Sequence, residues 1–266
     1  MIRQKLIENK IGEGRFRWRS NEISRIEGLS DAVFGFAITL LVVSLEVPKT
    51  FSELSHLMSG FGAFALSFML LFLVWFNQHK FFRRYGLQDA TTVWLNAALL
   101  FVILFYVYPL KFLFTFLVDR FTGGHGEIRL PNGNVEQMIE SDQQLGSLML
   151  IFGIGYFAVF AVFVLLHLHA YRKRGALELT ELERFDTLSS IQESGVNCAI
   201  ALVSICIVLF AGARYSGVAG MIYMLTGVVM GVHGFVMGSR RQKLAKRLEP
   251  ASLDAAGTAA LEPIND

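Results

Sequence analysis

The chain has 266 residues, of which 53% are hydrophobic and only 17% are charged, and its formal net charge is +2. Soluble domains have about a quarter of their residues charged, so a mean hydropathy of +0.48 excludes an ordinary soluble domain. The cysteines Cys198 and Cys206 share one apolar segment, which indicates neither a disulfide framework nor a zinc site. No pairing of a nucleophile with a base and no two-carboxylate site emerges. We therefore expect no enzyme, no cofactor and no bound metal.

Residues 1–24 form a basic, polar arm in front of the first apolar run, and arginines in it alternate with Phe16 and Trp18. One interpretation is an arm that lies on an anionic membrane surface. The other, which we favour, is ordinary juxtamembrane charge with aromatic anchors. The arm has no small-residue cleavage site, so the apolar run after it is expected to remain as an anchor.

Six apolar segments follow, each near the roughly 20 residues that a helix needs to cross a bilayer. The segments are continuously apolar rather than alternating, and backbone groups in lipid must pair within their own segment, which together favour helices over strands. We predict an all-α integral membrane protein with a single transmembrane domain over residues 25–238. The spans are placed at Gly28–Val47, Leu57–Phe76, Thr92–Val118, Leu145–Leu168, Gly195–Ala213 and Val218–Met237.

The basic residues set the expected orientation. Of the 24 lysines and arginines, 19 fall before the first span, in alternate connections, or after the last span. Because such residues are enriched on the cytoplasmic side, both termini are predicted to be cytoplasmic. The connection 119–144 is then external, and the tail 239–266 is cytoplasmic, first basic and then disordered.

Two patterns resemble capping boxes, in which a serine and a glutamate three residues later close the start of a helix. Ser24 and Glu27 predict a first helix that begins at Arg25, although Ser20 or Asn21 could begin it one turn earlier.

The second such pattern is Ser190 with Glu193, which would open the fifth span. We favour this structural role for Glu193, because an acid suits the positive end of a helix. An ion-path role is the alternative, because acids within membrane spans are usually functional. The run Gly153–Phe157 faintly resembles a carbonyl selectivity filter, but it lies inside a continuous apolar helix and is not expected to act as one.

The first span opens with a recognisable motif. Arg25-x-x-x-Leu29-Ser30-Asp31, with the apolar run that follows it, resembles the Arg-x-x-x-Phe-Ser-Asp signature of the transmembrane protein 175 family, which comprises lysosomal potassium channels and their bacterial relatives. The resemblance covers about the first 110 residues. Its further parts are Ser67-Phe68 with Trp75, Asn77 and His79 in the second span, and Leu95-Asn96 through Pro109 in the third.

The resemblance implies a homotetramer of six-span subunits whose first helices line a central pore without a carbonyl filter. Apolar side chains five, nine and twelve residues past the motif aspartate would form the constriction, which places it at Phe36, Leu40 and Val43. Phe36 stands where the family typically has isoleucine or leucine, and this departure bears on conduction more than on the fold. Leu29 replaces the aromatic residue of the motif and should be tolerated in a packing role.

The polar motif residues are expected to hold the pore helix in place and not to touch permeating ions. By resemblance they bond within and between subunits, and the predicted network is Arg25, Ser30, Asp31, Trp75, His79 and Asn96. Glu46 has two equally plausible roles, an acidic ring at the outer mouth that concentrates cations or a solvated residue at a helix end.

The favoured function is a potassium-permeable channel of a bacterial cytoplasmic membrane, with potassium ions, membrane lipids and further copies of the chain as partners, and no nucleic acid. Two alternatives stay open. Asp31 and His79 could form a relay in a proton leak or a proton-linked transporter. A non-conducting membrane scaffold is the other, and the bulk of Phe36 would favour it.

Overall fold

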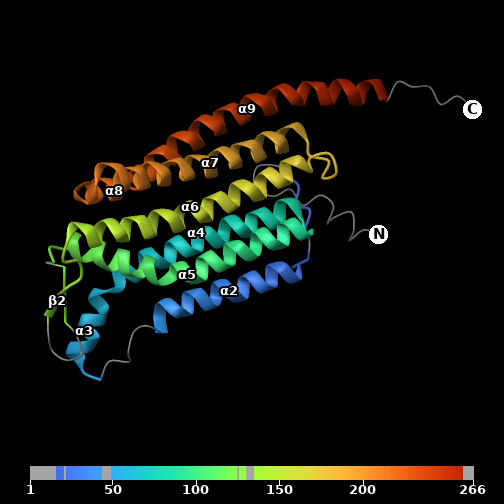
Figure 1. Ribbon diagram of the computed structural model, residues 1–266. Coiled ribbons are helices and arrows are strands. Elements are labelled where there is room, and N and C mark those ends of the chain that lie inside the picture. Colours follow the sequence, from blue (N-terminus) through green and yellow to red (C-terminus); the bar gives the residue numbers. More distant parts are fainter. Residues whose placement is uncertain (1–15, 21, 44–48, 125, 130–134, 260–266) are drawn as a thin grey trace, which may run out of the picture.

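The computed structural model describes residues 16–20, 22–43, 49–124, 126–129 and 135–259. Within these residues the protein is a layered bundle of long helices that run side by side (Figure 1). The long helices are α2 (Arg25–Val43), α4 (Phe61–Tyr85), α5 (Ala90–Phe121), α6 (Asp142–Arg172), α7 (Glu181–Cys206) and α9 (Leu225–Ala259).

Short elements lie between the long helices, mostly at one end of the bundle. They are α3 (Phe51–Ser59), β1 (Glu127–Arg129), β2 (Val135–Gln137), the π-helical turn η2 (Ile207–Ala211), the 3₁₀ turn η3 (Ala213–Tyr215) and α8 (Ser216–Ile222). The two strands pair antiparallel with Ile128 opposite Glu136, so the connection that follows α5 contains a small hairpin.

The helices pack in an order that leaves α2 and α9 at opposite edges of the bundle. The helix α2 contacts α4 and α5, α6 lies between α5 and α7, and α9 packs on α7 (Figure 1). One continuous core of buried apolar side chains joins the layers, with Leu41, Leu99, Leu110 and Leu166 fully enclosed.

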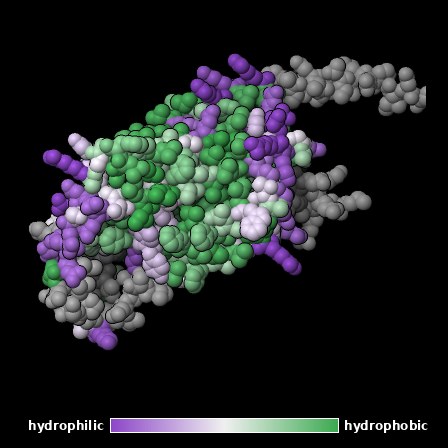
Figure 2. Space-filling view, in the orientation of Figure 1, coloured by the Kyte–Doolittle hydropathy of each residue, from purple (hydrophilic) through white to green (hydrophobic). Residues whose placement is uncertain are grey.

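The surface is that of a membrane protein. On the face in view, a broad apolar band covers the middle of the bundle, and polar side chains gather at its two ends (Figure 2). Five helical segments are long and apolar enough to cross a bilayer: Phe61–Tyr85, Ala90–Phe121, Asp142–Arg172, Glu181–Ala211 and Ala213–Leu248. The sixth long helix, α2, has 19 residues with charges at Arg25, Glu27 and Asp31 in its first two turns. The chain is therefore an all-helical, multi-pass membrane protein.

The helix α7 starts far earlier than the sequence predicts. Thr180 caps it, because the Thr180 hydroxyl accepts from the backbone N–H of Glu183 and the Glu183 carboxylate accepts from that of Thr180. The capping box predicted for Ser190 and Glu193 is wrong, since the Ser190 hydroxyl instead donates to the Asp186 carbonyl within the helix. Glu193 therefore caps nothing.

The second and sixth predicted spans also have different bounds. The second is divided between α3 and α4, and α4 continues to Tyr85, where Gly86 ends it with a φ of 59°, a conformation that glycine adopts without strain. The sixth is interrupted after α8, and α9 then runs to Ala259. The tail that the sequence predicts to be disordered therefore begins within α9. Its alanines have a high helix propensity, which favours the extension of the helix.

The N-terminal strap, Phe16–Ser20, is bound to the protein rather than extended as a free arm. The Phe16 ring is 1% exposed and stands edge-on to Tyr85, with ring centroids 5.6 Å apart. The Arg19 backbone N–H donates to the Arg83 carbonyl, and its guanidinium lies 2.7 Å from the Glu183 carboxylate. The strap thus connects the end of α4 and the start of α7 directly to the residues that precede α2.

Candidate pore helix and its anchoring network

The start of α2 is fixed by buried hydrogen bonds. The Glu27 backbone N–H donates to the Ser24 hydroxyl at 3.2 Å, and the Glu27 carboxylate accepts from the hydroxyls of Ser24 and Ser20. The predicted start of the first helix at Arg25 is confirmed. Because Glu27 is 6% exposed and belongs to the first turn, its charge also suits the positive end of the helix.

One face of α2 is buried against α4 and α5. Phe34, Ala37 and Leu41 are each at most 2% exposed and recur at the spacing of one helical face. In a soluble protein, burying a phenylalanine or leucine side chain contributes about 1.5–3 kcal/mol. Lipid supplies no hydrophobic driving force between helices, so close packing and polar contacts hold them together instead.

A buried chain of hydrogen bonds joins α2 to both neighbours. The Gln78 amide of α4 donates to the Asn96 carbonyl oxygen of α5 at 2.9 Å, and the Asn96 amide donates to the Ser30 hydroxyl at 2.9 Å. That hydroxyl donates in turn to the Ile26 carbonyl, one turn earlier in α2. All three side chains are at most 2% exposed, so a partner lost here would leave a polar group unpaired inside the bundle.

A second contact lies one residue further along α2. The Trp75 indole N–H donates to the Asp31 carboxylate at 2.8 Å, and the His79 ring stacks on the same indole with centroids 5.4 Å apart. The indole therefore lies between the two groups of the predicted proton relay. Among the described residues, no hydrogen bond joins Asp31 to His79 directly.

Of the six residues predicted for the network, the structure places five in two contact groups within one chain: Ser30 with Asn96, and Asp31 with Trp75 and His79. Arg25 is exposed and makes no hydrogen bond or ion pair to any residue that the structure describes. Gln78 belongs to the network but is absent from the prediction. The available signal is its place on α4 directly between Asn77 and His79, two polar residues that belong to the family resemblance.

The other end of α2 has a cationic partner. Lys111 of α5 donates from its Nζ to the Leu41 carbonyl at 2.9 Å. A positive charge near the last carbonyls of a helix is favourable, and these groups have no partner within the helix itself. The role of Lys111 is not predictable from its place in the sequence, and only the packing of α5 on α2 reveals it.

The residues predicted to form a constriction do not share one environment in the single chain. The Phe36 side chain is 58% exposed on the face of α2 that points away from α4 and α5. Leu40 is half-buried and packs against the core. The backbone of Val43 belongs to α2, whereas its side chain lies outside what the structure describes, as does the whole of Glu46.

The exposed face of α2 is largely apolar after its first two turns. Besides Phe36 it presents Leu29, Ala32 and Thr39, whose hydroxyl donates to the Phe36 carbonyl at 2.7 Å. Within the described residues, no group of three His, Cys, Asp or Glu side chains is arranged to hold a metal ion. The site is therefore a helix with one anchored face and one open, largely apolar face.

Comparison with known proteins identifies relatives for nearly the whole chain. It is 38% identical over 245 residues to a potassium channel of Marivirga tractuosa, a match that covers 91% of this chain and 98% of that protein. A potassium channel of Streptomyces collinus is 31% identical over 36% of this chain and half of its own length. The relatives are named as channels and not as enzymes, as the absence of a catalytic motif predicts.

Solved structures match the same architecture. The crystal structure of a variant of the potassium channel MtTMEM175, in complex with a nanobody fusion protein, superposes with a TM-score of 0.74 at 39% identity, covering 86% of this chain and 99% of that one. A TMEM175 homologue from Chamaesiphon minutus, at 23% identity and a TM-score of 0.51, shares the fold. The model of the family described as endosomal/lysosomal potassium channel TMEM175 matches residues 25–106, which contain α2 and its partners Trp75, Gln78 and Asn96. Because one relative is more than one-third identical along almost its entire length, this chain belongs to the TMEM175 family.

Proposed function

We propose that this chain is one subunit of a potassium-permeable channel in which α2 lines the pore. The observation that carries the proposal is the division of α2 into two faces. Its inner face is held by apolar packing and by the Ser30–Asn96–Gln78 hydrogen bonds, whereas Phe36 on the opposite face is 58% exposed. The relatives named as potassium channels support potassium as the permeant ion.

A pore between subunits accounts for both faces. A pore-lining helix must resist displacement while its other side contacts water and ions. Buried polar anchors restrict a helix to one position, because a shift would leave their donors and acceptors unpaired in the bundle. The open side would then meet the same side of three further copies, which makes the proposed assembly a homotetramer with its pore on the symmetry axis.

The proposed constriction consists of Phe36, Leu40 and Val43, with Phe36 the most accessible of those whose side chains are described. An apolar ring gates by dewetting, since water leaves a narrow passage that offers it no hydrogen bonds. An ion that crosses must give up part of its water shell without protein ligands. Sodium holds its water more tightly than potassium, so such a ring favours potassium. Glu46 would concentrate cations at the outer mouth as an acidic ring.

The membrane arrangement is part of the proposal. Arg83 and Arg84 at the end of α4 and Arg240 and Arg241 in α9 lie at the same end of the bundle as the N-terminal strap. Positive residues mark the cytoplasmic side, so both termini are placed there, in the cytoplasmic membrane of a bacterium.

The proposal is tested by ion flux in liposomes that contain the purified protein. With a potassium gradient, the protein should conduct without valinomycin, and Phe36→Ala should increase flux and weaken the preference for potassium over sodium. The matched control is Phe235→Ala, because Phe235 is 78% exposed on α9, far from α2. Unchanged currents in Phe36→Ala would remove Phe36 from the pore.

The same liposomes separate the alternatives. Proton flux without potassium flux, abolished in His79→Gln, would support a proton path that uses Asp31 and His79. A protein that passes neither ion would be a scaffold. Either outcome would overturn the potassium channel.

A further inference from the structure

Glu193 is a carboxylate in the middle of a membrane-spanning segment, with no side-chain partner in the described part of the chain. It lies twelve residues past the start of α7, within the apolar span Glu181–Ala211. Its backbone carbonyl accepts from the Asn197 amide, but its side chain makes no hydrogen bond or ion pair to any residue that the structure describes. Acids in such positions are costly and usually mark a functional site. Because Glu193 caps no helix, a purely local role does not account for it.

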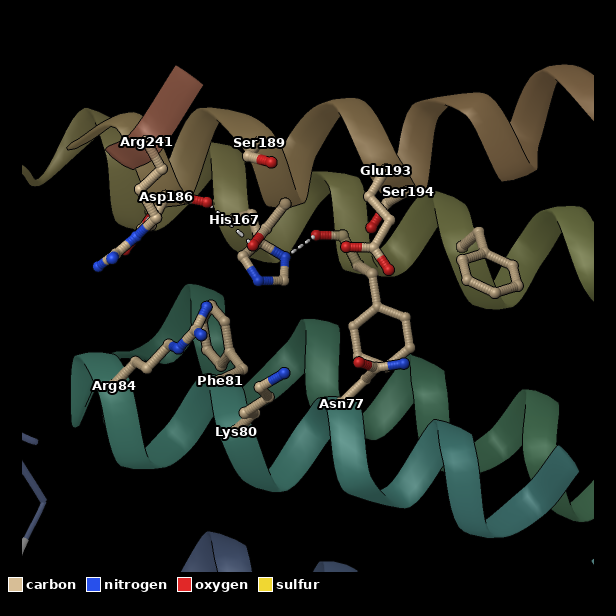
Figure 3. Close-up of a pocket in the computed structure, with 13 residues that line it drawn as sticks. Asn77, Lys80, Phe81, Arg84, His167, Asp186, Ser189, Glu193, Ser194 and Arg241 are labelled. Carbon is tan, nitrogen blue, oxygen red and sulfur yellow. Dashed lines mark hydrogen bonds and ion pairs between the residues drawn. The ribbon is translucent and has the colours of Figure 1, made fainter. Parts of the chain in front are cut away.

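Asn77 faces Glu193 across a cavity. The Asn77 amide rises from α4, and the Glu193 carboxylate descends from α7 toward it (Figure 3). Asn77 likewise has no side-chain hydrogen bond to the described residues. Two groups with unused hydrogen-bonding capacity therefore converge from facing helices. Glu193 is exposed and Asn77 is half-buried, so a third group can reach both side chains.

Both residues line two adjoining cavities of different character, each of about 360 Å³. The first is polar and opens toward the charged end of the bundle, beside Arg84, Asp186 and Arg241. The second lies deeper and is apolar, with Leu70, Val74, Ile103 and Val159 among its walls. Volumes of this size hold small organic ligands, which are typically bound by apolar walls and a few convergent polar groups.

The cations at the polar mouth have contacts of their own. Arg241 forms a two-pronged ion pair with Asp186, at 2.7 and 3.0 Å. The Arg84 guanidinium stacks over the Phe16 ring and the Lys80 ammonium over the Phe76 ring. Among the residues that line both cavities, Glu193 is the one that carries a charge, so the junction itself favours a positive group. Phe160 borders both cavities, and its ring lies 4.7 Å from that of Tyr156. Aromatic faces beside a carboxylate are suited to an organic cation.

We propose that this junction binds an organic ammonium ion with an apolar body. Its N–H groups donate to the Glu193 carboxylate and to the Asn77 carbonyl oxygen, and its hydrocarbon portion occupies the deeper cavity. The ligand enters from the charged end of the bundle through the polar cavity. A simple metal ion would leave the apolar cavity empty, and an anion would be repelled by Glu193. The site is separate from the exposed face of α2 and does not depend on the pore proposed there.

The test uses the full-length protein in lipid nanodiscs and 2-phenylethylammonium as the probe, with binding measured by calorimetry against empty nanodiscs. Two probes of similar shape, neutral 2-phenylethanol and anionic 3-phenylpropionate, serve as ligand controls. Glu193→Gln keeps the size of the side chain and should weaken binding of the ammonium about tenfold or more, as expected for a hydrogen bond to a charged group. Asn77→Leu should weaken it a few-fold, since a neutral acceptor contributes less.

The matched control is Glu181→Gln, the same change at an exposed position on the same helix. It should bind the ammonium as the unaltered protein does. Equal binding to Glu193→Gln and the unaltered protein would overturn the proposal. So would the absence of saturable ammonium binding, or binding of the alcohol or the carboxylate as tight as that of the ammonium. Unliganded melting temperatures of all variants verify that each is folded.

Discussion

Ser30 shows at the residue scale how a small polar group can position a whole helix. Its hydroxyl is fully buried, donates to Ile26 and accepts from Asn96. Ser30→Ala removes this acceptor but adds no bulk, which leaves the Asn96 amide unpaired. We expect a loss of about 1–3 kcal/mol in unfolding free energy, measured as a lower melting temperature in detergent.

The matched control for Ser30 is Ser147→Ala on α6, because Ser147 is exposed and, among the described residues, its hydroxyl bonds only to the Gln143 carbonyl of its own helix. It should melt close to the unaltered protein. If both serine variants melt alike, the buried network does not hold α2.

Gly155, which belongs to the run that resembles a selectivity filter, has a packing role. A Cβ at this position would clash with the Tyr106 ring, and the Tyr106 hydroxyl bonds to the Phe152 carbonyl of the same helix as Gly155. Gly155→Ala would therefore push the aromatic ring of α5 away from α6. Overpacking of this kind destabilises by about 1–3 kcal/mol. Gly231→Ala on α9, where nothing lies within 4 Å, is the control and should not lower the melting temperature.

At the scale of elements, the sequence predicts helices well where local signals determine them. The first helix begins at Arg25 as predicted, because its cap uses residues three apart in the chain. The start of α7 is missed, because its first four turns are polar and resemble a loop. Within this part, Glu183 contacts the strap and accepts from Arg19 across 164 residues of sequence. A contact so distant in sequence leaves no periodic signal.

The same contact gives a prediction about the strap. Glu183 is 1% exposed and receives the Arg17 backbone N–H as well as the Arg19 guanidinium. Glu183→Gln removes the charge that compensates Arg19, and losing a hydrogen bond between charged groups destabilises by about 1.5–3 kcal/mol. We expect trypsin to cleave faster after Arg17 or Arg19 in this variant. The rate is measured by mass spectrometry of the fragments. Glu181→Gln, exposed two residues earlier, should be cut at the normal rate.

The candidate site, like the start of α7, depends partly on contacts between residues that are distant in sequence. Ser30, Asp31, Trp75, His79 and Asn96 could be nominated from a motif, and the structure places them in contact. Gln78, Lys111 and the pair of Asn77 and Glu193 could not be assigned, because their roles depend on which helices face one another. Helix order in a bundle follows from the summed packing of many side chains, and an apolar segment of a membrane protein does not encode it locally.

For the whole molecule, the open face of α2 makes oligomerisation the decisive property. If α2 lines a shared axis, the purified protein should have about four times the 29.8 kDa of one chain. Phe36→Cys, in a background with Cys198 and Cys206 replaced by serine, should cross-link between subunits with a short bifunctional thiol reagent. Phe235→Cys on α9, exposed at the opposite edge of the bundle, is the control and should cross-link far less.

A monomer in both detergent and nanodiscs would remove the pore itself, since a single chain has no axis for α2 to line. A tetramer that cross-links through Phe235→Cys and not through Phe36→Cys would have a different consequence. The tetramer would remain, but α9 would lie at its centre in place of α2. The membrane span that contains α9 is unburied in the single chain. The two cysteine variants thus separate the oligomer from the identity of its central helix. Only cross-linking through Phe36→Cys agrees with an α2 that is anchored on one face and open to ions on the other.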